Sequence, residues 1–267
     1  MSTGFERNTP RALHREDPPE LARVVAVLVG TSHPGNVGSA ARALRTMGLS
    51  RLRLVNPRFH DITNRPEAIA FASGATQILA QATIHDTLSD ALADCVLGVA
   101  ISAEPREFGP LPQTPEDAAQ GILSTLRSDP EHQVALVFGA ERTGLSIEEV
   151  QRCGAMLSIP GHPQYSSLNL AQAVQIVAYV LRREALGESQ QPAAPTARLA
   201  EHAAVQGLIE HLEQTLLSIG FLDPDKPRKL MPRLARFIHR SRPSVEEVDL
   251  LRGICKATQA SVSRKPD

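Results

Sequence analysis

The chain has 267 residues, of which 42% are hydrophobic and 3% aromatic, and it contains no Trp. This length fits one large domain, or a large domain with a smaller one. So few aromatic residues argue against ligand binding dominated by aromatic stacking. The formal net charge of −1 gives no indication of a nucleic-acid partner for the chain as a whole.

Cysteine and histidine usage excludes two kinds of site. Cys95, Cys153 and Cys255 are far apart and odd in number, which argues against a disulfide framework and matches no zinc pattern. The nine histidines form no cluster with metal-ligand spacing, so we expect no metal. No apolar run reaches the roughly 20 residues of a membrane span, and the N-terminal segment lacks a signal-peptide core. We therefore expect a cytoplasmic protein without a membrane partner.

The first part of the chain predicts strands that alternate with helices. Residues 1–20, rich in charges and prolines, are expected to be a mobile arm, and residues 21–186 a domain. Such alternation indicates an α/β domain with a parallel sheet. In chain order the pattern predicts a strand at 23–29, a helix at 36–47, a strand at 52–55, helices at 66–79 and 87–93, a strand at 95–101, a helix at 115–126, a strand at 134–138, a short helix opened by a capping box at Ser146, a strand at 156–159 and a helix at 168–186.

Polar side chains precede two of these helices and are expected to cap them. Asn36 is positioned to cap the first helix. Ser166 and Ser167 are placed to cap helix 168–186, after a loop that contains two prolines and a glycine. Such a loop, running into a helix N-terminus, suits a ligand held by backbone groups. An ordinary strand-to-helix connection is the alternative interpretation.

The rest of the chain predicts a small helical module. Residues 187–197 have linker composition, and 198–267 show helical periodicity around Leu208 and Leu230, then a capping box at Ser244. Residues 223–267 carry 11 Lys and Arg against 6 Asp and Glu. A basic stripe along one side of the second tail helix consists of Lys229, Arg233, Arg236 and Arg240. This stripe predicts contact with RNA phosphates, although a solvated helix face is the plainer interpretation.

The glycine-rich loop after the first strand matches neither common nucleotide motif. Between Gly30 and Gly38 the spacing is wrong for G-x-G-x-x-G, and the chain contains no G-x-x-x-x-G-K-[ST]. We therefore exclude a dinucleotide fingerprint and a P-loop.

Three segments instead resemble, in order, the signatures of the SPOUT-type RNA methyltransferases. They are Gly35-Asn-Val-Gly-Ser-Ala-Ala-Arg42, Val137-Phe-Gly-Ala-Glu-Arg-Thr-Gly-Leu145 and Tyr165-Ser-Ser-Leu-Asn-Leu170. The resemblance is most specific to bacterial enzymes that methylate the ribose of cytidine or uridine 32 in the tRNA anticodon loop. It implies a parallel-sheet SPOUT domain with a C-terminal trefoil knot near Tyr165, S-adenosyl-L-methionine as cofactor, tRNA as substrate and a homodimer.

The resemblance also assigns roles to individual residues. Asn36, Arg42 and Ser166 fall on catalytic positions. Positions that hold the cofactor, largely through backbone groups, are matched by Ile101, Ser102, Gly139, Glu141, Ile159, Ser167 and Leu168. The basic stripe of the tail is the expected tRNA contact.

Asn36 and Arg42 also have plainer interpretations, as a helix cap and as a solvated residue. Arginine is a poor base, since its pKa lies above about 12. We therefore interpret Arg42 as a clamp on a phosphate and the target hydroxyl, while the base role proposed for its counterpart in the family stays open.

Two departures from the family pattern leave other functions open. Many relatives have an arginine where this chain has Ala140, and Glu104 replaces the first arginine of the loop after the third strand, where only Arg106 remains. The alternatives are a same-fold methyltransferase that acts on another RNA or on a base, and a non-catalytic RNA-binding relative.

Helix 168–186 is apolar on more than one side. Val174 and Val177 lie on one side, whereas Ile176 and Tyr179 spread over others. A helix that is apolar nearly all round is usually buried. One side is therefore available to a partner subunit, in agreement with the implied homodimer, in which Arg42 of one subunit would face RNA at the other's cofactor site.

Overall fold

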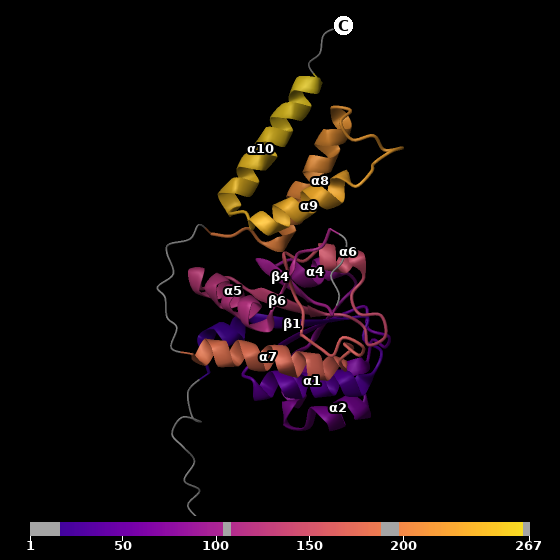
Figure 1. The fold of residues 1–267 in the computed structure, drawn as a ribbon, viewed down its shortest axis with the longest axis vertical. Coiled ribbons are helices and arrows are strands. Elements are labelled where there is room, and N and C mark those ends of the chain that lie inside the picture. Colours follow the sequence, from indigo (N-terminus) through magenta and orange to yellow (C-terminus); the bar gives the residue numbers. More distant parts are fainter. Residues whose placement is uncertain (1–16, 104–107, 188–197, 264–267) are drawn as a thin grey trace, which may run out of the picture.

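The computed structural model describes residues 17–103, 108–187 and 198–263, which form an α/β domain followed by a helical module (Figure 1). Within these residues seven strands form one sheet in the order β3-β2-β1-β6-β4-β7-β5, and all neighbours are parallel. The strands are β1 (Val24–Val29), β2 (Arg51–Val55), β3 (Thr83–His85), β4 (Leu97–Ile101), β5 (Pro112–Gln113), β6 (Val134–Phe138) and β7 (Ala155–Leu157). The predicted parallel α/β sheet is confirmed.

Helices cover both faces of the sheet. They are α1 (Pro34–Thr46), α2 (Pro66–Ala72), α3 (Thr76–Gln81), α4 (Leu88–Leu92), α5 (Pro115–Ser128), α6 (Ile147–Gln151) and α7 (Leu170–Leu186), with short 3-10 helices η2 (Pro19–Arg23), η3 (Ile62–Asn64) and η4 (Ser73–Ala75). Successive residues of a strand point to opposite faces. Ala26 and Leu28 therefore pack with α1, α5 and α7, whereas Val25 and Val27 pack with α4 and α6. All of β1 is buried, as predicted for a strand covered on both faces.

The two edge strands, β3 and β5, were not predicted. Their side chains are mostly exposed, so neither segment carries the apolar run that marks the inner strands. The single helix predicted at 66–79 is wrong, because it is broken into α2, η4 and α3. The break falls at Ser73, whose φ of 52° lies in the left-handed region, and Gly74 follows it.

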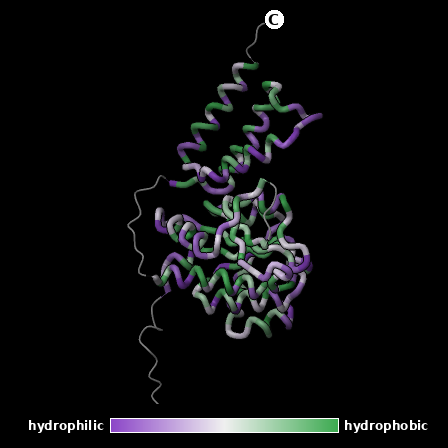
Figure 2. The backbone as a smooth tube through the Cα atoms, viewed as in Figure 1, coloured by the Kyte–Doolittle hydropathy of each residue, from purple (hydrophilic) through white to green (hydrophobic). Residues whose placement is uncertain are grey.

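The tail contains the three predicted helices, α8 (His202–Ser218), α9 (Leu230–Ser241) and α10 (Val245–Val262), and α10 begins with the predicted capping box at Ser244. Figure 1 places this module beyond α4 and α6, on one side of the domain. Figure 2 shows hydrophobic residues concentrated in the middle of the domain, whereas the loop between α8 and α9 is hydrophilic.

The module contacts the domain through the start of α8 and the end of α9. The His202 backbone N–H donates to the Cys95 carbonyl at 2.8 Å, and the Arg242 guanidinium donates to Thr125 Oγ1. The rings of His202 and His239 stack at 5.9 Å in this contact region. The orientation of the module relative to the sheet therefore depends on a few polar groups.

Parts of the predicted arm and linker lie outside the described residues, namely 1–16 and 188–197. The end of the predicted arm contacts the domain, because Asp17 pairs with Arg182 at 2.6 Å and Glu20 with Arg127 at 2.7 Å. None of the helices in the described ranges is long and apolar enough to cross a membrane.

Candidate active site

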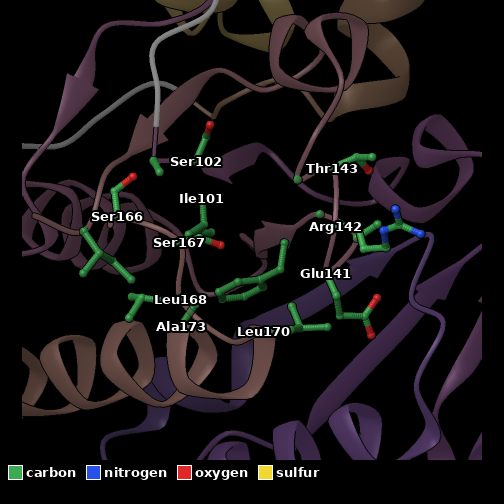
Figure 3. A pocket seen from close by; sticks show the side chains of 16 residues that line it. Ile101, Ser102, Glu141, Arg142, Thr143, Ser166, Ser167, Leu168, Leu170 and Ala173 are labelled. Atoms are coloured by element: carbon green, nitrogen blue, oxygen red, sulfur yellow. The ribbon is translucent and has the colours of Figure 1, made fainter. Parts of the chain in front are cut away.

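A cavity of about 310 Å³ lies where β4 and β6 end and the segment before α7 crosses them. In a parallel sheet, ligands commonly bind beyond the carboxyl ends of the strands. Figure 3 shows residues 166–168 on one side of this cavity and residues 141–143 on the other. All the residues predicted to hold the cofactor line it, namely Ile101, Ser102, Gly139, Glu141, Ile159, Ser167 and Leu168. Ser166, predicted as catalytic, lines it too.

The lining mixes apolar side chains with hydroxyl and backbone groups. Sequence reasoning missed Phe138, Leu170 and Ala173 on the apolar side, and Arg142 and Thr143 on the polar side. All but Ala173 lie inside the second or third motif, and this was the signal that could have identified them. The cavity volume lies within the range of small-ligand sites, about 300–1,000 Å³. A ligand with an apolar ring and several polar groups, such as S-adenosylmethionine, fits this chemistry.

Gly139 is required by close packing of two loop segments. A Cβ at this position would lie 2.1 Å from the Gly144 carbonyl carbon and 2.3 Å from the Leu145 nitrogen. Any side chain would therefore displace the loop that lines the cavity. The glycine keeps the end of β6 next to residues 144–145 and leaves its backbone facing the cavity.

The Glu141 carboxylate joins the second motif to the first. It accepts hydrogen bonds from the Thr31 hydroxyl at 3.0 Å, from the Ser32 backbone and hydroxyl at 3.1 Å, and from the His33 backbone at 3.2 Å. Asn36 Nδ2 donates to the same carboxylate at 3.0 Å. Glu141 therefore fixes the loop that leads into α1, in addition to lining the cavity.

These donors keep Glu141 ionised. Burial raises the pKa of its carboxyl. Hydrogen bonds from Asn36, Ser32 and Thr31 and a backbone hydrogen bond at Glu141 together lower the pKa by more than burial raises it, so the net pKa is about 2. At neutral pH the carboxylate is a permanent acceptor for the first motif. It has no proton to donate to a substrate.

Asn169 joins the third motif to the same network. Its Nδ2 donates to Asn36 Oδ1 at 3.0 Å, and its Oδ1 accepts from the Ala171 backbone at 3.0 Å. The prediction that Ser166 and Ser167 cap this helix is wrong, because α7 begins at Leu170 and Asn169 is the cap. Sequence reasoning did not select Asn169, although asparagine is a preferred N-cap residue.

Asn36 is likewise not a helix cap. α1 begins at Pro34, with His33 at the N-cap position and no capping side chain. Proline fits the first helical position because that N–H has no partner in a helix. The Asn36 side chain is thereby free of a capping role and links Glu141 to Asn169.

Arg42 lies about two turns along α1, exposed, and outside the cavity. It lines a shallow groove between α1, α2 and α7, together with Ser39, Phe71, Asn169 and Gln172. Asn169 and the residues beside it separate this groove from the cavity. The structure therefore brings Asn36 and Ser166 to the cavity side, but it leaves Arg42 of the same chain on the other side of the α7 N-terminus.

The predicted RNA-binding stripe lies on α9 and faces the loop before β5. Lys229 precedes the helix, and its Nζ lies 4.9 Å from the centre of the Phe108 ring. Arg233 lies 5.7 Å from the same ring. Arg236 and Arg240 line a second cavity beside Phe108. Ala140 lines the first cavity, whereas Glu104 and Arg106 lie outside the described residues.

No cluster of three or more His, Cys, Asp or Glu side chains that could hold a metal occurs in the part of the chain that the structure describes. Cys95 and Cys153 are buried, and burial raises the pKa of each thiol to about 12. Neither is therefore a reactive thiolate.

Comparison with known proteins agrees with this geometry. Residues 23–179 match the SpoU rRNA Methylase family, and residues 203–267 match the C-terminal domain of the tRNA methyltransferase TrmJ. The chain is 42% identical over 250 residues to the tRNA (cytidine/uridine-2'-O-)-methyltransferase TrmJ of Cronobacter sakazakii. This match covers 92% of this chain and 100% of the relative. It is 45% identical to the tRNA (cytidine/uridine/adenosine-2'-O-)-methyltransferase TrmJ of Pseudomonas aeruginosa, over 90% of this chain and 95% of the relative.

A solved structure shares both parts of the fold. The crystal structure of TrmJ from Z. mobilis ZM4 matches with a TM-score of 0.75 and 32% identity, over 87% of this chain and 97% of that one. The matches cover the sheet domain with its three motifs and the helical tail. The chain therefore belongs to the SpoU methylase family and, within it, to the TrmJ RNA methyltransferases.

Proposed function

We propose that this protein transfers a methyl group from S-adenosylmethionine to the 2'-hydroxyl of cytidine or uridine 32 in the tRNA anticodon loop. The observation that carries the proposal is that the second and third motifs line one cavity, and that Asn36 of the first motif joins them through hydrogen bonds to Glu141 and Asn169. Relatives of more than 40% identity along nearly the whole chain are named as tRNA 2'-O-methyltransferases. The nucleotide position rests on the sequence resemblance alone.

The cavity residues would hold the cofactor. Ile101, Ile159 and Leu168 offer apolar contacts, and Ser102 and Ser167 offer polar groups. S-adenosylmethionine supplies a methyl group on a positively charged sulfur, which needs no further activation. The protein's task is to place the ribose hydroxyl behind that methyl group and to assist removal of its proton.

Asn36, Glu141 and Asn169 act as positioning residues in this proposal. Their hydrogen bonds fix the start of α1 against the start of α7, so Ser166 and the cofactor loops keep one geometry. Ser166, half-buried at the cavity, is the proposed contact to the target ribose. A mobile loop would place the hydroxyl less accurately, and small misplacements lower rates strongly.

Arg42 is proposed to clamp the phosphate next to the target nucleotide and the target hydroxyl. A guanidinium has five donors and no acceptor, and it is a poor proton acceptor at neutral pH. The neighbouring phosphate then takes the proton. If Arg42 is itself the base, a lysine should be able to replace it. The Arg42→Lys variant would then be active, and its rate would rise with pH as the lysine loses its proton.

A homodimer completes the proposed site. Ile69 and Phe71 on α2 and Tyr179 on α7 are 46%, 53% and 53% exposed on the side of the molecule that carries Arg42. A second copy packed on α1 and α7 would cover them and would bring its own cavity to this Arg42. Mixing Arg42→Ala with Gly139→Trp, each inactive alone, should restore activity. A mixture as inactive as its components would contradict a shared site.

The direct test is nucleoside mapping by mass spectrometry. Unmodified tRNA transcripts are incubated with the protein and methyl-labelled S-adenosylmethionine, with ribosomal RNA as a parallel substrate. We expect label on the ribose of nucleotide 32, and none after that nucleotide is replaced by its 2'-deoxy form. Label elsewhere in tRNA corrects the position, and label only in ribosomal RNA or on a base overturns the proposal.

A further inference from the structure

A second cavity, of about 220 Å³, lies between α9 and the loop that leads into β5. None of the three motifs contributes to it. It is lined by Phe108, Pro110, Leu111, Gln113, Gln151, Cys153, Gly154, Ala155, Arg236, His239 and Arg240. The domain and the tail module therefore build this cavity together, and either part alone leaves it incomplete.

The domain side of this cavity is mainly apolar, with Phe108, Pro110, Leu111 and Ala155 beside Gln113 and Gln151. Leu111 is 73% exposed, although it is a large hydrophobic residue. Phe108 has a φ of 57°, a region that bulky side chains rarely adopt. Such strained positions persist where the surroundings hold them, and they cluster at functional sites. An aromatic ring beside an exposed leucine offers a flat apolar surface at the mouth of the cavity.

The module side is positively charged. Arg236 and Arg240 line the cavity, and Arg233 and Lys229 lie within cation–π distance of the Phe108 ring. Within the described residues, no carboxylate lies within ion-pair distance of Arg233, Arg236 or Arg240. Cations close to an aromatic ring, with two further guanidinium groups lining the cavity, favour a ligand that is both anionic and planar.

The second cavity is adjacent to the active site. Ala155 lines it at the start of β7, and Ile159, just past the end of that strand, lines the first cavity. These two residues are four positions apart, which spans roughly 13 Å in an extended chain. The Ser158 backbone N–H also donates to the Gln113 carbonyl at 3.0 Å, which ties together the walls of the two cavities. A nucleoside in the second cavity can therefore belong to the same RNA strand as a target ribose at the first cavity.

We infer that this cavity binds one unstacked nucleoside of the RNA substrate, close in sequence to the methylated nucleotide. Its base lies against Phe108 and Leu111, and its phosphate is held by Arg236 and Arg240. The inference rests on the proposed function. Single-stranded RNA loops are commonly recognised by bases that leave the stack and pack on aromatic or arginine planes. The cavity is smaller than sites that enclose a whole cofactor and suits a single base.

This arrangement gives the tail module a role beyond affinity. Because the module contributes Arg236 and Arg240 and the domain contributes Phe108, binding of this nucleoside sets the distance between the tRNA loop and the cofactor. Phe108 and Leu111 are therefore specificity-determining residues that lie outside all three motifs.

The test combines an abasic scan of the RNA with variants of the cavity. Anticodon stem-loops with a single base removed at each loop position are compared for binding by fluorescence anisotropy and for methyl transfer in single turnover. Loss of a stacked base should weaken binding by about tenfold at one position near the target. Phe108→Ala should bind the intact loop about tenfold more weakly and should become insensitive to base removal at that same position.

Two further variants keep the result interpretable. Leu111→Ser changes an exposed side chain, so it should fold normally and show a smaller version of the same loss. Lys256→Ala removes one positive charge from exposed α10, away from the cavity, and should keep the full sensitivity to base removal. Circular dichroism and S-adenosylhomocysteine binding check the fold of every variant.

The outcomes separate this inference from the proposed function. If wild-type protein binds the loop with one base-dependent position but transfers no methyl group, the proposed function is contradicted and the nucleoside site is supported. If it methylates tRNA but Phe108→Ala and wild type respond equally at every position, the nucleoside site is overturned. If Arg240→Ala weakens binding while every abasic loop binds as well as the intact one, the cavity holds phosphate only, and the inference also fails.

Discussion

The sheet domain and the tail module bury their apolar residues to different degrees. In the domain, Val24 to Leu28 of β1 are wholly buried, and helices cover both faces of the sheet. In the module, Phe237, Leu250 and Ile254 are 59%, 63% and 55% exposed, and its buried core is small. Free energy from apolar burial scales with the area removed from water. The domain is therefore expected to be stable alone, whereas the module depends on its contact with the domain.

The Glu141 network and the contact between module and domain satisfy their buried polar groups to different degrees. The Glu141 carboxylate in the domain accepts hydrogen bonds from at least four residues. At the contact between module and domain, His202 Nε2 and Arg242 Nε are buried with no hydrogen-bond partner among the described residues. Buried polar groups without partners are destabilising. The domain thus fixes the reacting groups, and the module is held by a contact that conditions can weaken.

The largest expected effect comes from removal of Arg42, which lies in the domain but outside its cavity. Arg42→Ala should lower the single-turnover rate by about 10²–10³-fold, the usual loss for one catalytic donor. S-adenosylhomocysteine affinity, measured by calorimetry, should stay within about twofold, because Arg42 does not line the cavity. Arg45→Ala, also exposed on α1, is the matched control and should keep wild-type activity. Near-normal turnover by Arg42→Ala would refute its role.

The next effect tests the close packing of the domain loops. Gly139→Ala adds a Cβ 2.1 Å from the Gly144 carbonyl carbon, and overpacking of this kind costs about 1–3 kcal/mol. Cofactor affinity should fall by roughly the same free energy, about fivefold to 150-fold, as the loop moves. Gly121→Ala in α5 is the control, because nothing lies within 4 Å of the added Cβ. It should raise the melting temperature, and equal behaviour of the two variants would contradict the packing argument.

Removal of the module should separate binding from folding. A chain that ends before Thr196 should stay folded and bind S-adenosylhomocysteine as the full chain does. Its tRNA affinity should fall by about tenfold or more, with a shallower dependence on salt, because the phosphate contacts of the basic stripe are lost. A triple variant of Arg233, Arg236 and Arg240 to Ala should reproduce the change in slope. Equal affinity of both chains across a salt series would show that the module does not bind tRNA.

The smallest effect concerns pH at the contact between module and domain. Burial is the main cause that lowers the pKa of His202 and of His239 to about 4, and the Arg152 charge, with the His239 charge for His202, contributes to the same shift. Both rings are therefore neutral in the docked state at neutral pH. Arg242 faces the same contact from the end of α9, and its pKa is lowered by burial, yet arginine stays charged.

The direction of the pH effect follows from proton uptake. Between pH 6.5 and 4 the undocked histidines bind more protons than the docked ones, so docking weakens as pH falls and is complete above about pH 6.5. Lowering the pH from 7 to 5.5 should shift the docking equilibrium by up to about tenfold for each histidine. Hydrogen exchange of α8 and α9 measures this, with β1 as the reference. His202→Phe should flatten the pH dependence, and an unchanged profile in that variant would contradict the assignment.

Local patterns were sufficient for much of the domain and of the first cavity. The inner strands are uniform apolar runs because both faces of the sheet are covered, so β1, β4 and β6 could be predicted without tertiary information. The capping boxes at Ser146 and Ser244 were predictable because both partners lie within one helical turn. Most cavity residues followed from the second and third motifs, which include the end of β6 and the start of α7.

What the sequence by itself determined is therefore what depends on neighbours along the chain: the inner strands, most helices, the caps with both partners in one turn, and the loops that carry the motifs. Tertiary structure alone decided the contacts between distant segments. The local sequence predicts that Asn36 caps a helix. Its side chain instead forms hydrogen bonds with Glu141 and Asn169, which lie 105 and 133 residues away. Phe108 shows no periodicity, and only the docking of α9 places cations around its ring. Such pairings are fixed by strand order and by module docking, because these bring together groups that no local pattern relates.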